Sequence, residues 1–312
     1  MSLKIAAIGL GHMGTIHLNK LVTFEGIEIS AIVDTDAALV TKLSKNVCAN
    51  AYADHRDAVQ SCDGAIIASP TKTHYAIGKA FLEAGKHVFM EKPVTVDPHE
   101  AQKLIDIANR NKLIFQVGHL ERFNPAFSQA LHFIEKPILI EGRRISPFTG
   151  RSTDVDVVLD LMIHDLDLVL SLMNNEIREL SAQGVCFMTD KLDAASARIE
   201  FTDGCVANLM ASRISTKRER TITIYEEDKS FSIDLLQGKF VSLVKNSDGT
   251  VDTTEYTATH VDPVQEELLE FIDSIQGKKT PSVTGIDGLK ALVLANRIKE
   301  YIAEKRRVSN IQ

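Results

Sequence analysis

The sequence of 312 residues has no tryptophan and only four cysteines, Cys48, Cys62, Cys186 and Cys205. Since no two of them form a C-x-x-C pair, the sequence predicts neither a structural zinc site nor a disulfide framework. No run of 18 apolar residues occurs, which argues against a membrane-spanning helix. The opening MSLKIAAIGLG is an apolar run too short for a secretory leader. We therefore expect a cytoplasmic protein with no membrane partner.

An excess of positive charge is also missing. Lysine and arginine number 35 against 42 aspartates and glutamates, and the net charge is −7. The basic residues are spread along the chain, apart from short clusters at 217–220 and 305–307. A nucleic-acid partner requires a basic surface, so none is expected. With 44% hydrophobic and 25% charged residues, the composition is that of a soluble globular protein, and the length suits two domains.

Short apolar runs alternate with longer amphipathic segments from the start to about residue 119. The predicted strands are Lys4–Ile8, Glu28–Val33, Ala65–Ala68, His87–Met90 and Ile114–Val117. The predicted helices are Thr15–Val22, Ala37–Ser44, Thr73–Ala84 and Pro98–Asn109. Repeated β-α-β units favour a doubly wound parallel sheet with its ligand at the carboxyl ends of the strands. We predict an α/β protein with a Rossmann domain over residues 1–120.

The pattern changes after residue 120 and becomes rich in strands. The expected elements are helices at Pro125–Ile134, Val157–Leu172, Pro263–Ile275 and Ile286–Ala303, and strands at Ile138–Ile145, Ile177–Phe187, Ala194–Phe201, Val206–Ser212, Arg220–Tyr225, Ser230–Asp234 and Phe240–Val244. Successive strands joined by short turns are typical of an antiparallel meander. We predict a second, α+β domain over residues 121–312 with a large, mostly antiparallel open sheet. The C-terminal helix, about 286–303, is a candidate to pack back on the first domain.

A glycine motif opens the first predicted helix directly after the first strand. It reads Gly9, Leu10, Gly11, His12, Met13, Gly14. In that context Gly9 permits a tight turn, Gly11 a close approach to a pyrophosphate, and Gly14 close packing of the helix, whose first N–H groups face the phosphates. The alternative interpretation is a plain strand-to-helix turn.

An acidic residue, Asp34, stands 20 residues beyond Gly14, at the end of the second predicted strand. A carboxylate at this place accepts hydrogen bonds from a ribose diol and repels a 2′-phosphate, which predicts NAD rather than NADP. The alternative for Asp34 is an ordinary cap at the end of a strand.

Further motifs follow in a fixed order. They are Ser69-Pro70-Thr71 with His74 a turn later, Glu91-Lys92-Pro93, and Asp160-Leu161-Met162-Ile163-His164. With these motifs and the glycine motif, the chain resembles the Gfo/Idh/MocA oxidoreductases over essentially its whole length. The resemblance implies an NAD cofactor that also meets His12, Met13, Ser69, Pro70, Thr71, His74, Glu91 and Lys92. It implies no metal, although His164, Asp165 and Asp167 are of a suitable ligand type.

Three residues are candidates for catalysis. Lys92 follows a parallel strand at its carboxyl end, and Asp160 and His164 share a helix face, so the acid can orient the imidazole. Oxidation of a secondary alcohol needs a base while hydride leaves for the nicotinamide, and either Lys92 or His164 suits that role. The alternatives are a solvated loop lysine and a surface ion pair. Because the helix is apolar nearly all round, the pair is expected to be buried.

The expected substrate class comes from a narrower resemblance. Residues 117–126 and 146–151 are similar to the family members that oxidise the 3-hydroxyl of UDP-N-acetylglucosamine to a ketone. This implies substrate contacts from Arg122, Asn124 and Arg151 in addition to Lys92, Asp160 and His164. Arg143 and Arg144 are further candidates for the diphosphate, which guanidinium groups bind well. One departure is residues 154–159, which replace a glycine-rich stretch of many relatives.

Two other functions stay open. A dehydrogenase of a free sugar or inositol would not need the arginines. A non-catalytic NAD-binding regulator is a hypothesis of another class, and it predicts loss of Lys92 or of the Asp160 and His164 pair, which this chain keeps. Family members pair their open sheets face to face, so we also expect a homodimer or homotetramer.

Overall fold

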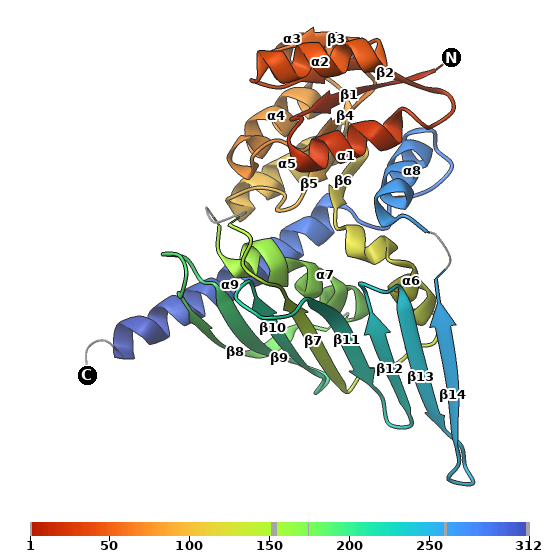
Figure 1. The fold of residues 1–312 in the computed structure, drawn as a ribbon, viewed down its shortest axis with the longest axis vertical. Coiled ribbons are helices and arrows are strands. Elements are labelled where there is room, and N and C mark those ends of the chain that lie inside the picture. The colour runs from red at the N-terminus through yellow and green to blue at the C-terminus, as the bar shows by residue number, and fades with distance from the viewer. Residues whose placement is uncertain (1, 151–154, 174, 259–260, 310–312) are drawn as a thin grey trace. The chain divides into compact units, whose positions relative to one another are not determined.

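The chain forms two compact units in a computed structural model (Figure 1). The first comprises Met1–Leu120 and Asp262–Leu289, and the second Glu121–Val261 and Lys290–Gln312. The structure describes residues 2–150, 155–173, 175–258 and 261–309. Within those residues, no helix has both the length and the apolar character that crossing a bilayer would require.

Six parallel strands form the sheet of the first unit, in the spatial order β3-β2-β1-β4-β5-β6. They are β1 (Leu3–Ile8), β2 (Ile27–Val33), β3 (Asn50–Tyr52), β4 (Gly64–Ile67), β5 (His87–Glu91) and β6 (Phe115–Gly118). The order reverses at β1, and a doubly wound sheet binds its ligand beside that reversal. The predicted strands are confirmed. The prediction missed β3, a strand of three partly exposed residues with no apolar run.

Helices connect these parallel strands. They are α1 (His12–Leu21), α2 (Ala37–Val47), α3 (His55–Ala58) with the 3₁₀ turn η1 (Val59–Ser61), α4 (Thr71–Glu83) and α5 (Pro98–Arg110). A further helix of this unit, α8 (Pro263–Ile275), comes from a later part of the chain. Aspartates decide where several of them begin. Asp36 accepts hydrogen bonds from the Ala38 and Leu39 amides, and Asp97 accepts one from His99. Caps of this kind stabilise a helix by about 1 kcal/mol each.

The helix α8 belongs to the first unit, although the sequence-based division placed all residues after 120 in the second domain. Its apolar side chains Leu268, Phe271 and Ile272 are buried in the same core as Leu18 and Phe89. Their spacing puts them on one stripe of the helix, which must be covered by an apolar surface. The position of α8 along the chain did not indicate that this surface is formed by residues as far upstream as Leu18 and Phe89. The start of the last helix, to Leu289, also groups with the first unit.

The second unit contains one sheet of eight strands, in the order β14-β13-β12-β11-β7-β10-β9-β8. The strands are β7 (Leu139–Ile145), β8 (Ile177–Val185), β9 (Ala194–Phe201), β10 (Val206–Ser212), β11 (Glu219–Tyr225), β12 (Lys229–Asp234), β13 (Lys239–Lys245) and β14 (Val251–Thr257). All neighbours are antiparallel except β7 and β10, which run parallel. The predicted mostly antiparallel sheet is confirmed. The polar, exposed edge strand β14 was missed because its sequence, VDTTEYT, lacks an apolar face.

Helices pack against one face of this sheet (Figure 1). They are the 3₁₀ turn η2 (Leu120–Phe123), α6 (Pro125–Ala130), the π-helical turn η3 (Val158–Met162), α7 (Ile163–Leu172) and α9 (Gly285–Ser309). The core between them includes Phe127 of α6, Leu166 of α7 and Ile298 of α9. The helix predicted over Pro125–Ile134 is shorter, and the one over Val157–Leu172 begins as a π-helical turn.

Candidate active site

The glycine motif forms a tight turn between β1 and α1. Gly9 has a φ of +83°, and a Cβ there would lie 2.5 Å from the Ser69 amide nitrogen. A Cβ on Gly14 would lie 1.7 Å from the Gly9 carbonyl oxygen, whereas one on Gly11 would meet nothing within 4 Å among the described residues. Only glycine fits the two crowded positions, and the third faces open space.

The start of α1 suits a phosphate group. Gly11 is its N-cap residue, and no described side chain caps the helix there. The first amide groups of a helix lack partners within it and carry partial positive charge, so they bind anions. The open space at Gly11 lies at the same point. The motif therefore fits the pyrophosphate of a dinucleotide, and His12 and Met13 form the first turn of α1 beside it.

Asp34 closes the glycine turn at the end of β2. One carboxylate oxygen accepts a hydrogen bond from the Leu10 amide at 2.6 Å, and the other accepts one from Asp36 at 3.0 Å. Each carboxylate oxygen has a second acceptor position, so Asp34 can hold the turn and still bind a hydroxyl. The structural and the ligand-binding roles considered for Asp34 are thus compatible.

A pocket of about 330 Å³ opens beside this turn, entirely within the first unit. Its lining comes from the ends of β1 and β2, the start of α3, and α4, and comprises Ile8, Gly9, Val33, Asp34, Thr35, Ala53, His55, Ser69, Pro70, Lys72, Thr73, Ala76 and Ile77. Mostly apolar walls with a few polar groups are typical of a small-molecule site. Sequence reasoning found Gly9, Asp34, Ser69 and Pro70 here and missed the others, of which Ala53 and His55 follow the strand it did not predict.

His74 is a structural residue of this region. It is buried in α4, with its ring nitrogens 2.8 Å from the Ser69 carbonyl oxygen and 3.0 Å from that of Pro93. Burial lowers the pKa of His74, although both carbonyl oxygens favour the protonated ring. A neutral imidazole has one N–H and so donates to one of the two carbonyls. His74 thereby ties the turn after β4 to the turn after β5, and Thr71 only begins the helix that carries it.

Lys92 follows β5 at the carboxyl edge of the sheet, as predicted. The Glu91 side chain is buried, and one of its oxygens lies 2.7 Å from Nε2 of His17. The other accepts a hydrogen bond from the Lys92 amide at 3.1 Å. Burial alone would raise the pKa of Glu91, but the hydrogen bond and charge of His17, with the charge of Lys92, bring it below its ordinary value. Glu91 is therefore an ionised support for the backbone that carries Lys92.

Asp160 and His164 lie in the second unit, at the junction of η3 and α7. His164 is 9% exposed and Asp160 is half-buried, so the histidine is buried as expected and the aspartate only partly. Asp160 sits in the π-helical turn, a geometry that occurs often at functional sites. The segment before it has its own role, because Asp156 accepts hydrogen bonds from Val158 and Leu159 and lies 3.0 Å from Lys299. A capped start therefore replaces the glycine-rich stretch of many relatives.

Most of the arginines expected at the substrate have carboxylate partners within the second unit. Arg122 binds Asp167 with two hydrogen bonds, at 2.7 and 2.8 Å. Arg144 is fully buried and donates to Glu121 and Asp165, both at 2.7 Å. Because Asp165 and Asp167 belong to α7, these pairs hold the helix that carries His164. Arg151, also expected at the substrate, lies outside the described residues.

Two neighbouring side chains further change the set of residues expected to bind the substrate. The Asn124 amide donates to the Leu235 carbonyl at 2.9 Å, and its oxygen caps α6 at Ala126, so the fold occupies it. Arg220, which sequence reasoning missed, lies beside Arg144 in the register of β11 and β7 and is 40% exposed at its side chain. Its guanidinium is 3.4 Å from Glu121. The feature that could have pointed to Arg220 is its position in a strand that pairs with the strand of Arg143 and Arg144.

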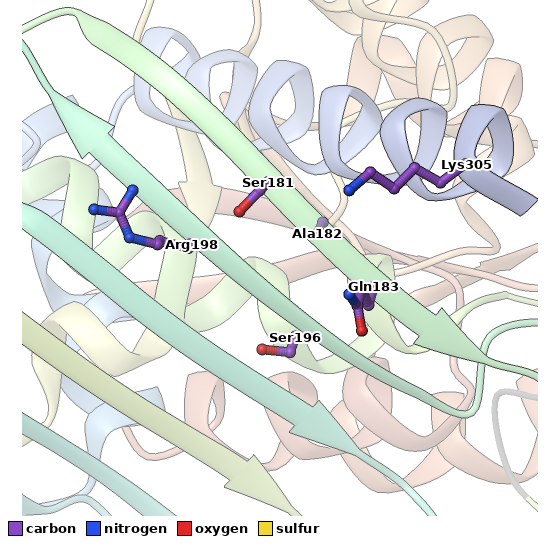
Figure 2. A pocket seen from close by; sticks show the side chains of 6 residues that line it. All are labelled: Ser181, Ala182, Gln183, Ser196, Arg198 and Lys305. Atoms are coloured by element: carbon purple, nitrogen blue, oxygen red, sulfur yellow. The ribbon is translucent and has the colours of Figure 1, made fainter.

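A second hollow, of about 220 Å³, lies on β8 and β9 in the second unit (Figure 2). Its lining is Ser181, Ala182, Gln183, Ser196, Arg198 and Lys305. Ser181 and Arg198 are cross-strand partners, as are Gln183 and Ser196, so these four side chains share one face of the sheet. The hollow contains none of the predicted site residues and no buried charged group, and it has no place in the candidate active site.

The comparisons with known proteins agree with this geometry. Residues 3–119 match the oxidoreductase family model with an NAD-binding Rossmann fold, and residues 151–309 match the C-terminal alpha/beta domain of the same family. The chain is 31% identical to the UDP-N-acetylglucosamine 3-dehydrogenase of Acidithiobacillus ferrooxidans over 95% of its own length and 96% of that protein. It is 25% identical to the myo-inositol 2-dehydrogenase of Thermotoga maritima over 98% of both chains.

Solved structures show the same fold. A structure of the Acidithiobacillus ferrooxidans enzyme matches with a TM-score of 0.91 at 29% identity, covering 97% of this chain and 98% of that one. The scyllo-inositol dehydrogenase of Lactobacillus casei, solved with NAD(H) and scyllo-inositol, matches with a TM-score of 0.83 at 24% identity and covers 98% of both chains. The protein therefore belongs to the Gfo/Idh/MocA family of NAD-binding oxidoreductases.

Proposed function

We propose that this oxidoreductase converts a secondary hydroxyl of a nucleotide sugar to a ketone, and that the hydroxyl is the 3-hydroxyl of UDP-N-acetylglucosamine or a related compound. The observation that carries the proposal is the similarity to a UDP-N-acetylglucosamine 3-dehydrogenase, which extends over nearly the whole of both chains at 31% identity. Resemblance of the substrate-domain segments 117–126 and 146–151 to such enzymes supports it. When bound, NAD would accept the hydride from the reacting carbon.

The chain supplies groups for the accompanying proton. Lys92, held through its amide by Glu91, is proposed to bind the reacting hydroxyl or take its proton. His164 is proposed as the alternative base, with Asp160 orienting its ring. Both are on positions that neighbouring side chains fix, Lys92 by Glu91 and His164 by the ion pairs of α7. Preorganised placement of this kind is what general acid-base chemistry needs.

The cofactor is proposed to be NAD rather than NADP, bound by Gly9, Gly11 and Asp34 together with the walls of the adjoining pocket. An ionised Asp34 beside the pocket attracts a ribose diol and repels a 2′-phosphate. Lys72 also lines the pocket and is a cation that a phosphate could bind, whereas burial lowers the pKa of His55 and favours its neutral ring. The charge of Asp34 is therefore the property to test.

A specific observation favours a second candidate, a dehydrogenase of a free sugar or inositol. Arg122 and Arg144, two of the guanidinium groups expected to bind a diphosphate, are neutralised by buried carboxylates. A myo-inositol 2-dehydrogenase is also similar over the full length of this chain. On this hypothesis Arg220 would be dispensable for substrate binding.

A direct assay separates the candidates. Purified protein is given NAD with UDP-N-acetylglucosamine, UDP-glucose, free N-acetylglucosamine or myo-inositol, and reduced nicotinamide is followed by its emission, which no tryptophan obscures. We expect the highest kcat/KM with UDP-N-acetylglucosamine. A higher kcat/KM with inositol or a free sugar would select the second candidate. Bound cofactor that is reduced by none of a broad set of polyols and nucleotide sugars would refute both.

A further inference from the structure

A cluster of three buried titratable side chains lies beneath the Glu91-Lys92-Pro93 turn, within the first unit. His17 comes from α1, Glu91 from the end of β5 and Glu267 from α8. Their exposed fractions are 0%, 6% and 0%, and one nitrogen or oxygen from each lies within 4.8 Å of the other two. The proposed function uses Glu91 to hold Lys92 but gives no role to Glu267.

Glu267 is unusual among the described residues because neither oxygen of its buried carboxyl group has a hydrogen-bond partner. The helix that carries it is nevertheless held in place, since Nε2 of Gln116 on β6 donates to the Glu267 main-chain carbonyl at 2.9 Å. Room for the neighbouring Glu91 carboxylate comes from Gly118, where a Cβ would lie 3.3 Å from the carboxyl carbon. The two acids are thus placed together by backbone packing, not by chance side-chain positions.

The charged groups around Glu267 do not favour ionisation of its carboxyl group beside the ionised Glu91. The titratable and charged groups nearby are His17 and Lys20 of α1, Glu91 and Lys92 at the end of β5, and Asp262 and Glu270 of α8. His17 is engaged by Glu91 and Lys20 by Asp262, while β6 offers only the neutral Gln116. An isolated buried carboxylate is costly, and such a group takes up a proton instead. Burial, followed by the charge of Glu91, raises the pKa of Glu267 well above its usual range.

We propose that Glu267 is a positioning residue that carries a proton at neutral pH, and that its neutral carboxyl group lets the ionised Glu91 hold the backbone of Lys92. The Glu267 carboxyl then carries one proton, and Nε2 of His17 donates a hydrogen bond to Glu91. When Glu267 loses its proton, two carboxylates face each other in a buried site. Their repulsion acts on Glu91 and through it on the Lys92 amide.

The sign of the pH effect follows from this proton count. The folded state binds the Glu267 proton more tightly than the unfolded chain does, so this contribution to stability is complete below the unfolded pKa. It is lost as pH rises toward the folded pKa. Within that window the folding equilibrium constant falls by up to about tenfold per pH unit. A neutral side chain of the same shape would abolish the dependence.

The test compares Glu267→Gln with Glu266→Gln, whose carboxylate is exposed on the same helix. We expect the infrared band of a protonated carboxyl group in the wild type at pH 7 and in Glu266→Gln, but not in Glu267→Gln. We also expect the melting temperature of Glu267→Gln to rise relative to the wild type as pH increases from 5 to 9, with no such trend for Glu266→Gln. An unchanged infrared band, or parallel melting curves, would overturn the proposal.

The effect on Lys92 rests on the proposed function and is measured separately. At high pH we expect Glu267→Gln to retain more of its kcat than the wild type, with KM for the sugar unchanged, because Lys92 is displaced only in the ionised cluster. If no sugar is oxidised, the proposed function fails while the infrared and melting results still decide the protonation of Glu267. Calorimetric binding of Zn²⁺ or Mn²⁺ that Glu267→Gln abolishes would make the cluster a cation site and overturn the proposal.

Discussion

At the scale of single residues, the charge of Asp34 sets the first prediction. NAD is expected to bind at least about tenfold more tightly than NADP, a ratio that requires about 1.4 kcal/mol. Asp34→Asn should reduce the ratio by relieving repulsion of the 2′-phosphate. Because the amide nitrogen cannot accept, the variant also loses one of the bonds from Leu10 or Asp36 and should bind NAD somewhat less well. Titration of both cofactors into both proteins measures this, and equal affinities in the wild type would contradict it.

Substitutions of Lys92, His164 and Asp160 are expected to lower turnover by different amounts. Lys92→Met keeps the stem without the charge, so kcat should fall by roughly 10²-fold or more while NAD affinity through the glycine turn is preserved. His164→Asn should act similarly. Asp160→Asn should be milder, because an amide still accepts one hydrogen bond from the ring.

The control for these variants is Lys72→Met, which removes a lysine from the pocket beside Asp34 instead. It should change cofactor affinity more than kcat. A Lys92→Met enzyme with near-normal kcat and normal NAD binding would show that Lys92 is a solvated loop lysine without a catalytic role.

At the scale of elements, the ion pairs that hold α7 give a prediction about stability. Arg144→Met leaves Asp165 buried without its cation and Glu121 with only Arg220, at 3.4 Å, and loss of a buried partner typically costs about 3–5 kcal/mol. Its neighbour Arg143 provides the matched control, because its pair with Glu219 is 52% exposed at the arginine and should contribute about 0–1 kcal/mol. Urea unfolding of Arg144→Met and Arg143→Met measures the difference. Equal losses would show that the buried network does not stabilise this helix.

The same elements show what the sequence could and could not predict. The strands of the first sheet, the glycine turn and the buried helix of Asp160 and His164 were predictable, because apolar periodicity and turn residues are local properties. The partners of Arg122 and Arg144 were not, since an arginine that pairs with a buried aspartate has the same local pattern as one that binds a diphosphate. The cluster of His17, Glu91 and Glu267 was also beyond prediction, because its members are joined only by packing of α8 on the first core.

At the scale of the whole molecule, the open sheet of the second unit predicts an assembly. One face carries the helices and the core. The other face presents Asn208 and Met210 of β10 and Thr221 and Thr223 of β11, all half-buried, beside Tyr225, which is 37% exposed. Such a broad mixed face suits pairing with a second copy. Light scattering at micromolar concentration should give a dimer or tetramer, and a mass of 34.4 kDa would contradict this.

The discontinuous first unit limits how such enzymes can be recombined. In genetic terms, residues 121–261 are an insertion between β6 and α8, and a fusion made only at residue 120 would leave Leu18 and Phe89 without the helix that covers them. A chimera that exchanges the substrate-binding unit therefore needs matched junctions after Leu120, Val261 and Leu289. The last of these falls inside α9, so the donor must also supply a helix that continues in the same register without a linker.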